Sequence, residues 1–256
     1  MKLYFLGTCA GSEPMPDRKH MSFALECDEN IYWFDAGESC SHTAHNLGVD
    51  LLNVKKVVIS HPHMDHVGGL GNLLWNIRKL YLMKKPDRVS DIDVYIPNLQ
   101  TWEGIMMILR NTEGNFKIPF CIQAHKTHDG VLFDDGSVRV TAFHNLHIST
   151  PENQWQSYSF LIECREKRIV YSGDVKCYSE LDTIIGTGCD NLIIETGHFG
   201  IDDVYAYTKN KAIGKIYFTH NGREIINSSE LAAEKVNRLF KNNAAICFDG
   251  MVELLE

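Results

Sequence analysis

Four potential metal ligands occur within six residues of this chain, and no other feature constrains its fold so strongly. The segment reads His61-Pro62-His63-Met64-Asp65-His66 and follows the apolar run Val57-Val58-Ile59. A β-branched run bounded by polar residues predicts a buried strand, so the ligands come where the chain leaves a sheet. His61 and His63 are two residues apart in an extended segment and therefore project from the same side of the chain. Ligands held at a strand end predict a rigid metal site.

The number of ligands predicts more than one ion. Asp65 and His66 turn toward a position next to that of His61 and His63. Because one open catalytic ion cannot use all four ligands once others join, we expect a two-metal site. A solvated histidine-rich turn is the alternative. It is disfavoured because the motif lies between a strand and an apolar helix, not in a low-complexity tract.

Composition places the chain among folded globular proteins. It has 256 residues, 44% of them hydrophobic and 23% charged, which is enough for one large core or two fused halves. Its 25 Lys and Arg against 33 Asp and Glu give a net charge of −8, and no Lys/Arg-rich run occurs. Broad affinity for nucleic acid is therefore not expected, although bound metals could still attract a single phosphate.

Cysteine use and hydropathy predict a cytoplasmic protein. The eight cysteines are scattered without a Cys-x-x-Cys pair, and several lie in apolar segments, so we expect reduced thiols. No basic segment followed by a long apolar run opens the chain, and no apolar stretch reaches the roughly 18 residues needed to span a bilayer. We therefore expect no association with a membrane.

The pattern His61-x-His63-x-Asp65-His66 resembles the signature of the metallo-β-lactamase superfamily of metal-dependent hydrolases. Within the superfamily the chain is most similar to ribonuclease Z and its relatives, through Leu6-Gly7-Thr8, residues 34–38 and Ser60-His61. The resemblance implies an α/β (α+β) fold, a four-layer αβ/βα sandwich with two central mixed sheets and helices outside. It also implies a single domain over residues 1–256.

Strands and helices are expected to alternate through both halves, without an evident repeat. We expect helices at residues 67–83, 99–109 and 231–240, and strands at residues 2–6, 23–27, 30–34, 93–96, 131–133, 138–143, 156–164, 168–171, 191–194, 215–218 and 244–248. The strands at 23–27 and 30–34 should form a hairpin across Asp28-Glu29.

Several polar residues outside the motif are candidates for the site. Asp35 follows a strand, and the resemblance implies that it holds the outer nitrogen of a ligating histidine; a helix N-cap is the alternative. His20, in a loop that also carries Arg18, is expected to face either the metals or solvent. The remaining isolated histidines lack nearby ligands and are interpreted as surface residues on a helix (His42, His45) or in a polar loop (His125, His128).

The C-terminal half should supply the remaining ligands. His144 and His147 both occur after the strand at 138–143, and the spacing in ribonuclease Z-like sequences implies His147, with His144 as the alternative. Asp174 follows the strand at 168–171, where a carboxylate could bridge two ions. The last ligand of the family corresponds to His220.

The resemblance thus implies a full ligand set for two divalent ions. One ion takes His61, His63 and His147, the other takes Asp65, His66 and His220, and Asp174 is shared. Nitrogen and carboxylate ligands suit zinc first, with manganese or iron as alternatives.

Two such ions predict hydrolysis by water. They lower the pKa of a bridging water toward about 7 and supply the metal-bound hydroxide, with Asp65 in the catalytic set. His198, close to Glu195, is the candidate proton donor to the leaving group; the alternative is a cap of the following helix.

We expect the substrate to be a small phosphodiester. Asp174 stands where some lactam-hydrolysing members carry cysteine, which favours phosphodiesters over lactams. The 27 residues from His147 to Asp174 leave room for a loop and one hairpin, but not for the long arm with which ribonuclease Z grips transfer RNA. A lactone, thioester or β-lactam hydrolase and a ribonuclease Z-type tRNA 3′ endonuclease are the alternatives. A redox protein is disfavoured, and a homodimer stays open.

Overall fold

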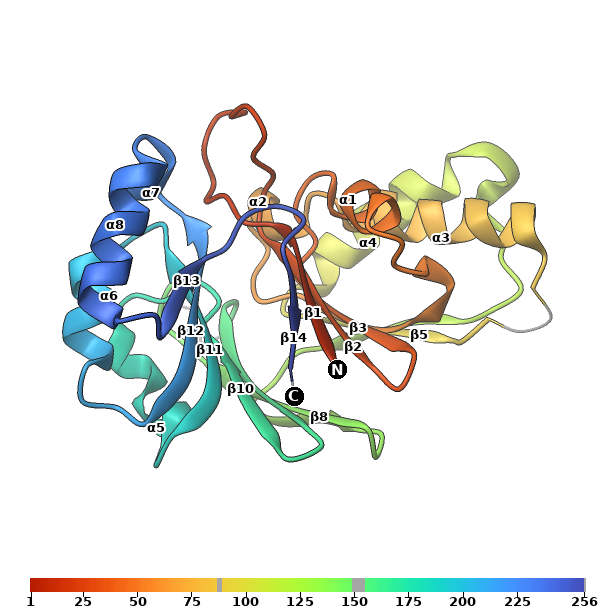
Figure 1. Cartoon of the computed structure of the whole chain (residues 1–256). Helices are drawn as coiled ribbons and strands as arrows, with labels where there is room; N and C mark the ends of the chain where they lie inside the picture. Colours follow the sequence, from red (N-terminus) through yellow and green to blue (C-terminus); the bar gives the residue numbers. More distant parts are fainter. Residues whose placement is uncertain (87–88, 149–154, 256) are drawn as a thin grey trace. The chain divides into compact units, whose positions relative to one another are not determined.

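The chain divides into two compact units, each with its own sheet and hydrophobic cluster (Figure 1). The structure is a computed structural model and describes residues 1–86, 89–148 and 155–255. Unit 1 holds residues 1–7, 14–127 and the C-terminal residues from Asp249, and unit 2 holds residues 8–13 and 128–248. The single domain expected over residues 1–256 stays a prediction.

Unit 1 is built on a seven-stranded mixed sheet of order β14-β1-β2-β3-β4-β5-β6. The strands are β1 (Lys2–Gly7), β2 (Ser22–Cys27), β3 (Asn30–Phe34), β4 (Val54–Val58), β5 (Ile92–Ile96), β6 (Ile122–Lys126) and β14 (Val252–Leu254). The pairs from β14 to β3 are antiparallel, and those from β3 to β6 are parallel. Asp28 and Glu29 join β2 to β3 with φ of 49° and 66°, the geometry of a turn that matches twisted strands.

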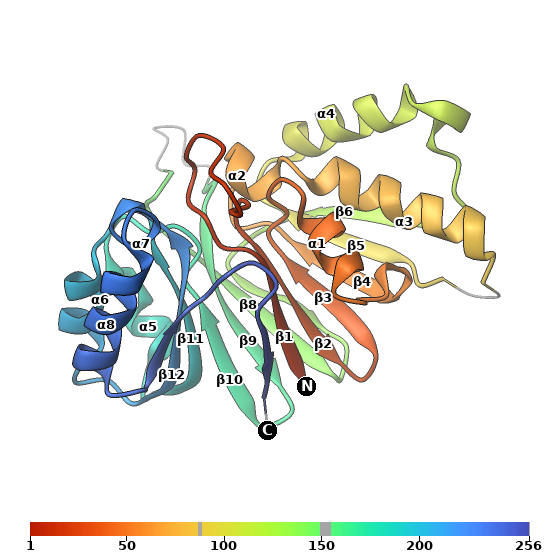
Figure 2. The same cartoon turned by 45° about the horizontal axis from the view of Figure 1, so that its top comes forward.

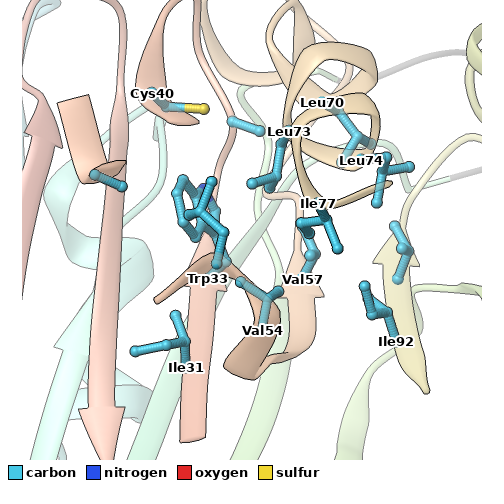
Figure 3. Packing of buried hydrophobic residues seen from close by; sticks show 14 of the residues in the cluster. Ile31, Trp33, Cys40, Val54, Val57, Leu70, Leu73, Leu74, Ile77 and Ile92 are labelled. Carbon is cyan, nitrogen blue, oxygen red and sulfur yellow. The ribbon is translucent and has the colours of Figure 1, made fainter. Parts of the chain in front are cut away.

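Helix α3 (Leu70–Lys84) packs against this sheet and fixes the strand that carries the metal motif. Its inner side chains recur at helical spacing and are fully buried: Leu70, Leu73, Leu74 and Ile77. Figure 3 shows them facing Trp33 of β3, Val57 of β4 and Ile92 of β5. Because each fully buried side chain of this size stabilises the fold by about 1.5–3 kcal/mol, this layer holds β4 firmly.

The other helices of unit 1 flank α3. They are α1 (Cys40–Asn46), α2 (Met64–Val67), α4 (Leu99–Arg110) and the 3₁₀ turns η1 (Leu51–Asn53) and η2 (Glu113–Phe116). Helix α4 lies alongside α3 (Figure 2). Among the described residues, no helix combines the length and apolar character that a bilayer crossing requires.

The helix expected at residues 67–83 begins only at Leu70, because two glycines separate it from α2. The Gly69 N–H donates to the Ala36 carbonyl at 2.7 Å. A Cβ at Gly69 would lie 2.2 Å from the Gly37 carbonyl oxygen, so the close approach of the two backbones requires glycine there. The interruption turns the four-residue helix α2 into a separate element that presents Asp65 and His66.

Unit 2 is built on a second seven-stranded sheet, of order β13-β12-β11-β10-β9-β8-β7. The strands are β7 (Gly130–Asp134), β8 (Val138–His144), β9 (Tyr158–Cys164), β10 (Lys167–Tyr171), β11 (Cys189–Thr196), β12 (Ile213–Asn221) and β13 (Ala244–Ile246). The pairs from β7 to β10 are antiparallel, and those from β10 to β13 are parallel. Both units therefore share a pattern in which antiparallel pairs are followed by three parallel pairs.

The parallel strands of unit 2 bring polar residues to one edge of its sheet. The carboxyl ends of parallel neighbours lie together, and here they carry Asp174 after β10, Glu195 in β11 and His220 in β12. The helices of this unit are η3 (Tyr178–Leu181), α5 (Asp182–Ile185), α6 (Ile201–Thr208), α7 (Arg223–Ile226) and α8 (Ser229–Phe240). Helices α6 and α8 pack together, and α8 packs on β13 (Figure 1).

The two mixed sheets with packed helices confirm the expected fold class, and three local expectations besides the helix start at residue 67 were wrong. His125 lies in β6, not in a loop, and pairs with Tyr95 of β5. The strand expected at 215–218 continues through His220 to Asn221. The last strand is β14, which is too short for its alternation to be recognised and pairs with β1.

Candidate metal centre

In unit 1 the motif begins where β4 leaves the sheet. The Ile59 N–H still bonds to the Tyr95 carbonyl at 2.8 Å, and the chain then turns through Pro62 into α2. His61 Nε2 lies 3.0 Å from His63 Nδ1, so the two side chains converge as their spacing predicted. The ring of His66 lies 4.0 Å from that of His61, centroid to centroid.

Asp35 and Ser60 determine which nitrogen of each histidine is available. The Asp35 carboxylate is fully buried and accepts the Ser60 N–H at 2.6 Å, the Ser60 hydroxyl at 2.7 Å and His66 Nδ1 at 2.7 Å. Since the Ser60 hydroxyl donates to Asp35, its oxygen accepts from His61 Nδ1 at 3.0 Å. Both imidazoles therefore carry the lone pair of Nε2 on the side away from these partners.

Asp65 lies in the first turn of α2, next to His66. Its Oδ2 is 3.5 Å from His66 Nε2.

The helix N-cap alternative for Asp35 is wrong, because the residue at the N-cap of α1 is Ser39. Asp35 instead holds the outer nitrogen of His66, which is the arrangement implied by the superfamily resemblance.

In unit 2 three imidazoles surround one carboxylate. Asp174, 2% exposed, has its Oδ2 at 3.4 Å from His220 Nε2, 3.7 Å from His147 Nε2 and 3.8 Å from His198 Nδ1. These distances exceed the 2.7–3.2 Å of ordinary N–H···O hydrogen bonds. They are suited to atoms that converge on a common point from different strands.

A β-bulge determines the orientation of the His220 side chain. The register between β11 and β12 shifts there, so that Thr219 pairs with Glu195 and Asn221 with Thr196, and His220 is the extra residue with φ of 47°. A Cβ at Gly197 would lie 2.4 Å from His220 Nδ1. Glycine at this position therefore lets the imidazole lie directly over the backbone that follows β11.

His198 forms a charge-assisted pair with Glu195. Its ring atom Nδ1 lies 2.7 Å from Glu195 Oε2, and its backbone N–H donates to the same oxygen at 3.2 Å. The hydrogen bond that His198 donates to Glu195 raises the pKa of His198 above 6.5, although partial burial opposes the shift. Burial and Asp174 act to raise the pKa of Glu195, but the hydrogen bond from His198 and the His220 imidazole, whose Nδ1 lies 3.5 Å from Oε2, prevail and lower it. His198 is thus a half-exposed imidazole that retains its proton to higher pH.

The other candidate histidines lie elsewhere in their units. His144 is held by Asp129, whose carboxylate accepts its Nδ1 at 2.6 Å and its N–H at 2.7 Å, and its ring stacks on Trp155. His125 pairs with Asp93 and stacks on Tyr95. Among the described residues, the groups that could hold a metal include none of these, nor His20, His42, His45 and His128.

The donor set fits divalent metal ions. A tetrahedral zinc ion with ligands at about 2.0–2.2 Å separates neighbouring ligand atoms by about 3.4 Å. The separations of Asp174 from His220 and of Asp65 from His66 are 3.4 and 3.5 Å. Within unit 2, Asp174, Glu195, His198 and His220 form a group able to hold an ion. Both units therefore present nitrogen and oxygen ligands at distances that suit metal binding.

Comparison with known proteins then identifies the family. The model of the family described as anti-Pycsar protein Apyc1 matches residues 1–209 of the chain. The chain belongs to this family. The match includes every candidate ligand except His220.

Curated relatives of this Apyc1-family chain are ribonucleases Z. The enzyme of Methanothermobacter thermautotrophicus is 28% identical over 56% of the chain, and that of Picrophilus torridus is 29% identical over 66%. The matched parts cover 43% and 49% of those proteins, so the chain spans about half the length of the curated relatives it matches.

Solved structures share the fold. The short form of human tRNase Z (ELAC1) has a TM-score of 0.73 at 20% identity, with 100% of both chains covered. The metallo-β-lactamase fold protein YhfI from Bacillus subtilis has a TM-score of 0.75 at 15% identity and 98% coverage of both. A diphosphatase of the PhnP family has a TM-score of 0.69 at 17% identity, covering 100% of this chain and 98% of its own. The metallo-β-lactamase fold and the ribonuclease Z-like resemblance are thereby confirmed.

Sequence reasoning missed the residues that orient the ligands. Ser60 entered only as part of the family resemblance, and Glu195 only as a neighbour of His198, yet both bond to candidate site histidines. Their position at strand ends was the available signal. Glu180, which bonds to two of the ligand-bearing loops, had no such signal because it lies inside a 3₁₀ turn.

Proposed function

We propose that this Apyc1-family protein is a metal-dependent hydrolase whose two units work as one domain with a dinuclear centre. One ion would be held by His61, His63 and His147, the other by Asp65, His66 and His220, with Asp174 shared. The pairing of ligands from the two units rests on the superfamily resemblance. The observation that carries the proposal is the convergence of His147, His198 and His220 on the buried Asp174 carboxylate.

Two divalent ions, zinc or else manganese or iron, would supply a water activated at neutral pH and neutralise charge on a phosphoryl oxygen. The protein's own residues would orient the histidine ligands, bind the ions and donate a proton. Asp35 and Ser60 keep the Nε2 lone pairs of His66 and His61 directed outward. Asp65 lies beside His66 and would act both as a ligand and in the catalytic set.

His198 would deliver the proton that the leaving group requires. Glu195 raises the pKa of this imidazole and fixes its orientation by accepting a hydrogen bond from Nδ1, so Nε2–H would be the donor. The side chain of His198 is 45% exposed, so its ring is accessible to substrate. A buried carboxylate with a half-exposed imidazole is the expected construction of a general acid.

The substrate we propose is a small phosphodiester. Net charge −8 offers little attraction for a long nucleic acid, and the described residues between Trp155 and Asp174 form only the β9–β10 hairpin. The similarity in fold to a PhnP-family diphosphatase fits chemistry at a phosphorus atom.

A second candidate is a ribonuclease Z-type endonuclease that trims precursor transfer RNA at its 3′ end. The ribonucleases Z among the curated relatives favour it. The two candidates differ in the size of the substrate that the protein must hold, because transfer RNA requires many phosphate contacts.

One assay separates the candidates. The zinc- or manganese-loaded protein is compared on bis(p-nitrophenyl) phosphate, a precursor transfer RNA, a lactone, a thioester and a β-lactam. We expect turnover of the small phosphodiester and poor processing of the precursor. Efficient trimming of the precursor would favour the second candidate, and turnover of the lactone, thioester or lactam alone would contradict both.

A further inference from the structure

Glu180 bonds to two separate loops of unit 2, each of which carries a candidate metal ligand. It is the third residue of the turn η3 (Tyr178–Leu181). Its Oε1 accepts the Leu146 N–H at 2.8 Å, and its Oε2 accepts the N–H groups of Lys176 at 2.9 Å and Cys177 at 3.4 Å. Leu146 directly precedes His147, and Lys176 follows Asp174 by two residues.

The bonds to Glu180 complete the anchoring of the His147 loop. On its other side this loop is tied to β9, since Asn145 donates to the Ser159 hydroxyl at 3.0 Å and the Ile148 N–H donates to the Ser157 hydroxyl at 3.0 Å. Those contacts fix the loop relative to β9. Glu180 fixes it relative to the segment that carries Asp174.

We propose that Glu180 is a positioning residue that sets the separation between His147 and Asp174. Its carboxylate joins the two loops, and the ligand atoms His147 Nε2 and Asp174 Oδ2 lie 3.7 Å apart as a result. This role rests on the proposed function, because it presupposes that both residues bind metal. No direct contact of Glu180 with substrate or metal is needed.

A simpler role for Glu180 is the capping of η3. A glutamate at the third position of a helical turn commonly accepts the N–H of the cap residue, as Glu180 does for Cys177. Capping needs one oxygen, Oε2, and leaves Oε1 without a task. The bond from Leu146, 34 positions away, is therefore what distinguishes a bracket between loops from a local cap.

Glu180→Gln separates the two roles. Glutamine serves as well as glutamate in a capping box, but it has a single oxygen and replaces the other with an NH₂ group. If that oxygen accepts from Lys176 and Cys177, the NH₂ group faces the Leu146 N–H, donor against donor. If the amide rotates, the Leu146 bond is kept and the cap is lost. In either orientation one of the two loops is released.

The experiment measures amide hydrogen exchange by NMR and zinc affinity by chelator competition on the whole chain, with and without zinc. We expect Glu180→Gln to accelerate exchange about tenfold either at Leu146 or at Lys176 and Cys177, but not at all three. We expect the affinity for one of two ions to fall about 10-fold, at the lower end of the range for outer residues of metal sites. Glu180→Ala should release all three amides.

Asp203→Asn is the matched control. Asp203 is the third residue of α6 and accepts the Gly200 N–H at 2.9 Å, so it caps its helix as Glu180 caps η3. Within the described part of the chain, its carboxylate makes no hydrogen bond to the loops of His147 and Asp174. We expect normal exchange at Leu146 and normal zinc affinity in this variant.

Two results would overturn the inference: unchanged protection of all three amides in Glu180→Gln, or released amides with unchanged zinc affinity in both Glu180 variants. A wild-type protein that binds fewer than two ions would contradict the proposed function instead, and the exchange data would still report whether Glu180 joins the loops.

Discussion

Replacing Asp35 with asparagine should move the proton of the neutral His66 imidazole from Nδ1 to Nε2 and so disable a metal ligand. The carboxylate of Asp35 only accepts hydrogen bonds, and His66 must therefore donate from Nδ1 and keep its lone pair on Nε2. The asparagine side chain would place an NH₂ group among the same donors, because its single oxygen cannot replace both Oδ1, which accepts the Ser60 backbone N–H, and Oδ2, which accepts from the Ser60 hydroxyl and His66. An imidazole that accepts from this NH₂ group carries its proton on Nε2, where a metal would bind.

The magnitude follows from the hydrogen bonds lost. Asp35 accepts three bonds at 2.6–2.7 Å in a fully buried position. Hydrogen bonds to charged groups stabilise by about 1.5–3 kcal/mol each. Restoring the metal-binding tautomer in the Asp35→Asn protein would forfeit at least one of them, which weakens the ion held by His66 by about 10- to 100-fold, the range expected for outer partners of ligating histidines.

Zinc affinity by chelator competition and the ¹⁵N shifts of His66 in metal-free protein measure the two consequences. Asp93→Asn is the control, since Asp93 accepts from His125 Nε2 at 2.7 Å in the same unit, away from the motif. We expect Asp35→Asn to lose affinity and show Nε2–H, and Asp93→Asn to keep two ions. Full zinc affinity in Asp35→Asn, with His66 still protonated on Nδ1, would refute this reasoning.

Four further predictions concern unit 2. His147→Ala should lose one ion and the hydrolytic activity, whereas His144→Ala should keep both ions by elemental analysis; the reverse pattern would exchange their roles. Gly197→Ala should weaken one ion about tenfold or more in chelator competition, because its Cβ would lie 2.4 Å from His220 Nδ1; unaltered affinity would show that the ring can move. Because the pKa of His198 is raised, the imidazolium that donates the proton persists to a higher pH than the ordinary 6.5. We expect kcat to fall as the pH rises through the raised pKa. His198→Gln should lower kcat about 100-fold or more for alkyl leaving groups but little for p-nitrophenolate, which needs no proton; equal losses would argue against a proton donor.

The parts of the site that sequence could predict depend on local geometry or on the family motif. Residues two apart in an extended segment must share a side, so the convergence of His61 and His63 followed from their spacing. The hairpin across Asp28-Glu29 followed from two short strands and a two-residue turn. Asp35 was placed by resemblance to the family, and its bond to His66 agrees.

The remaining features depend on contacts between distant residues. The strand expected at 215–218 was too short. β12 pairs with β11 on both sides of a β-bulge at His220, so the strand continues to Asn221. The early helix start at residue 67 was wrong because Gly69 packs on the backbone at Gly37, 32 positions earlier. Glu180 bonds to Leu146 from a turn whose own sequence has no periodic pattern. None of these pairings leaves a signal in a single sequence.

The central claim, a dinuclear centre built from seven ligands, is tested most directly by the number of metal ions per chain. The whole chain, purified without chelator, resupplied with zinc or manganese and desalted, is measured by elemental analysis beside its Asp65→Ala and His220→Ala variants. We predict two ions per chain in the wild-type protein and a loss of one ion in each variant. A single ion per chain that persists unchanged in both variants would contradict the claim.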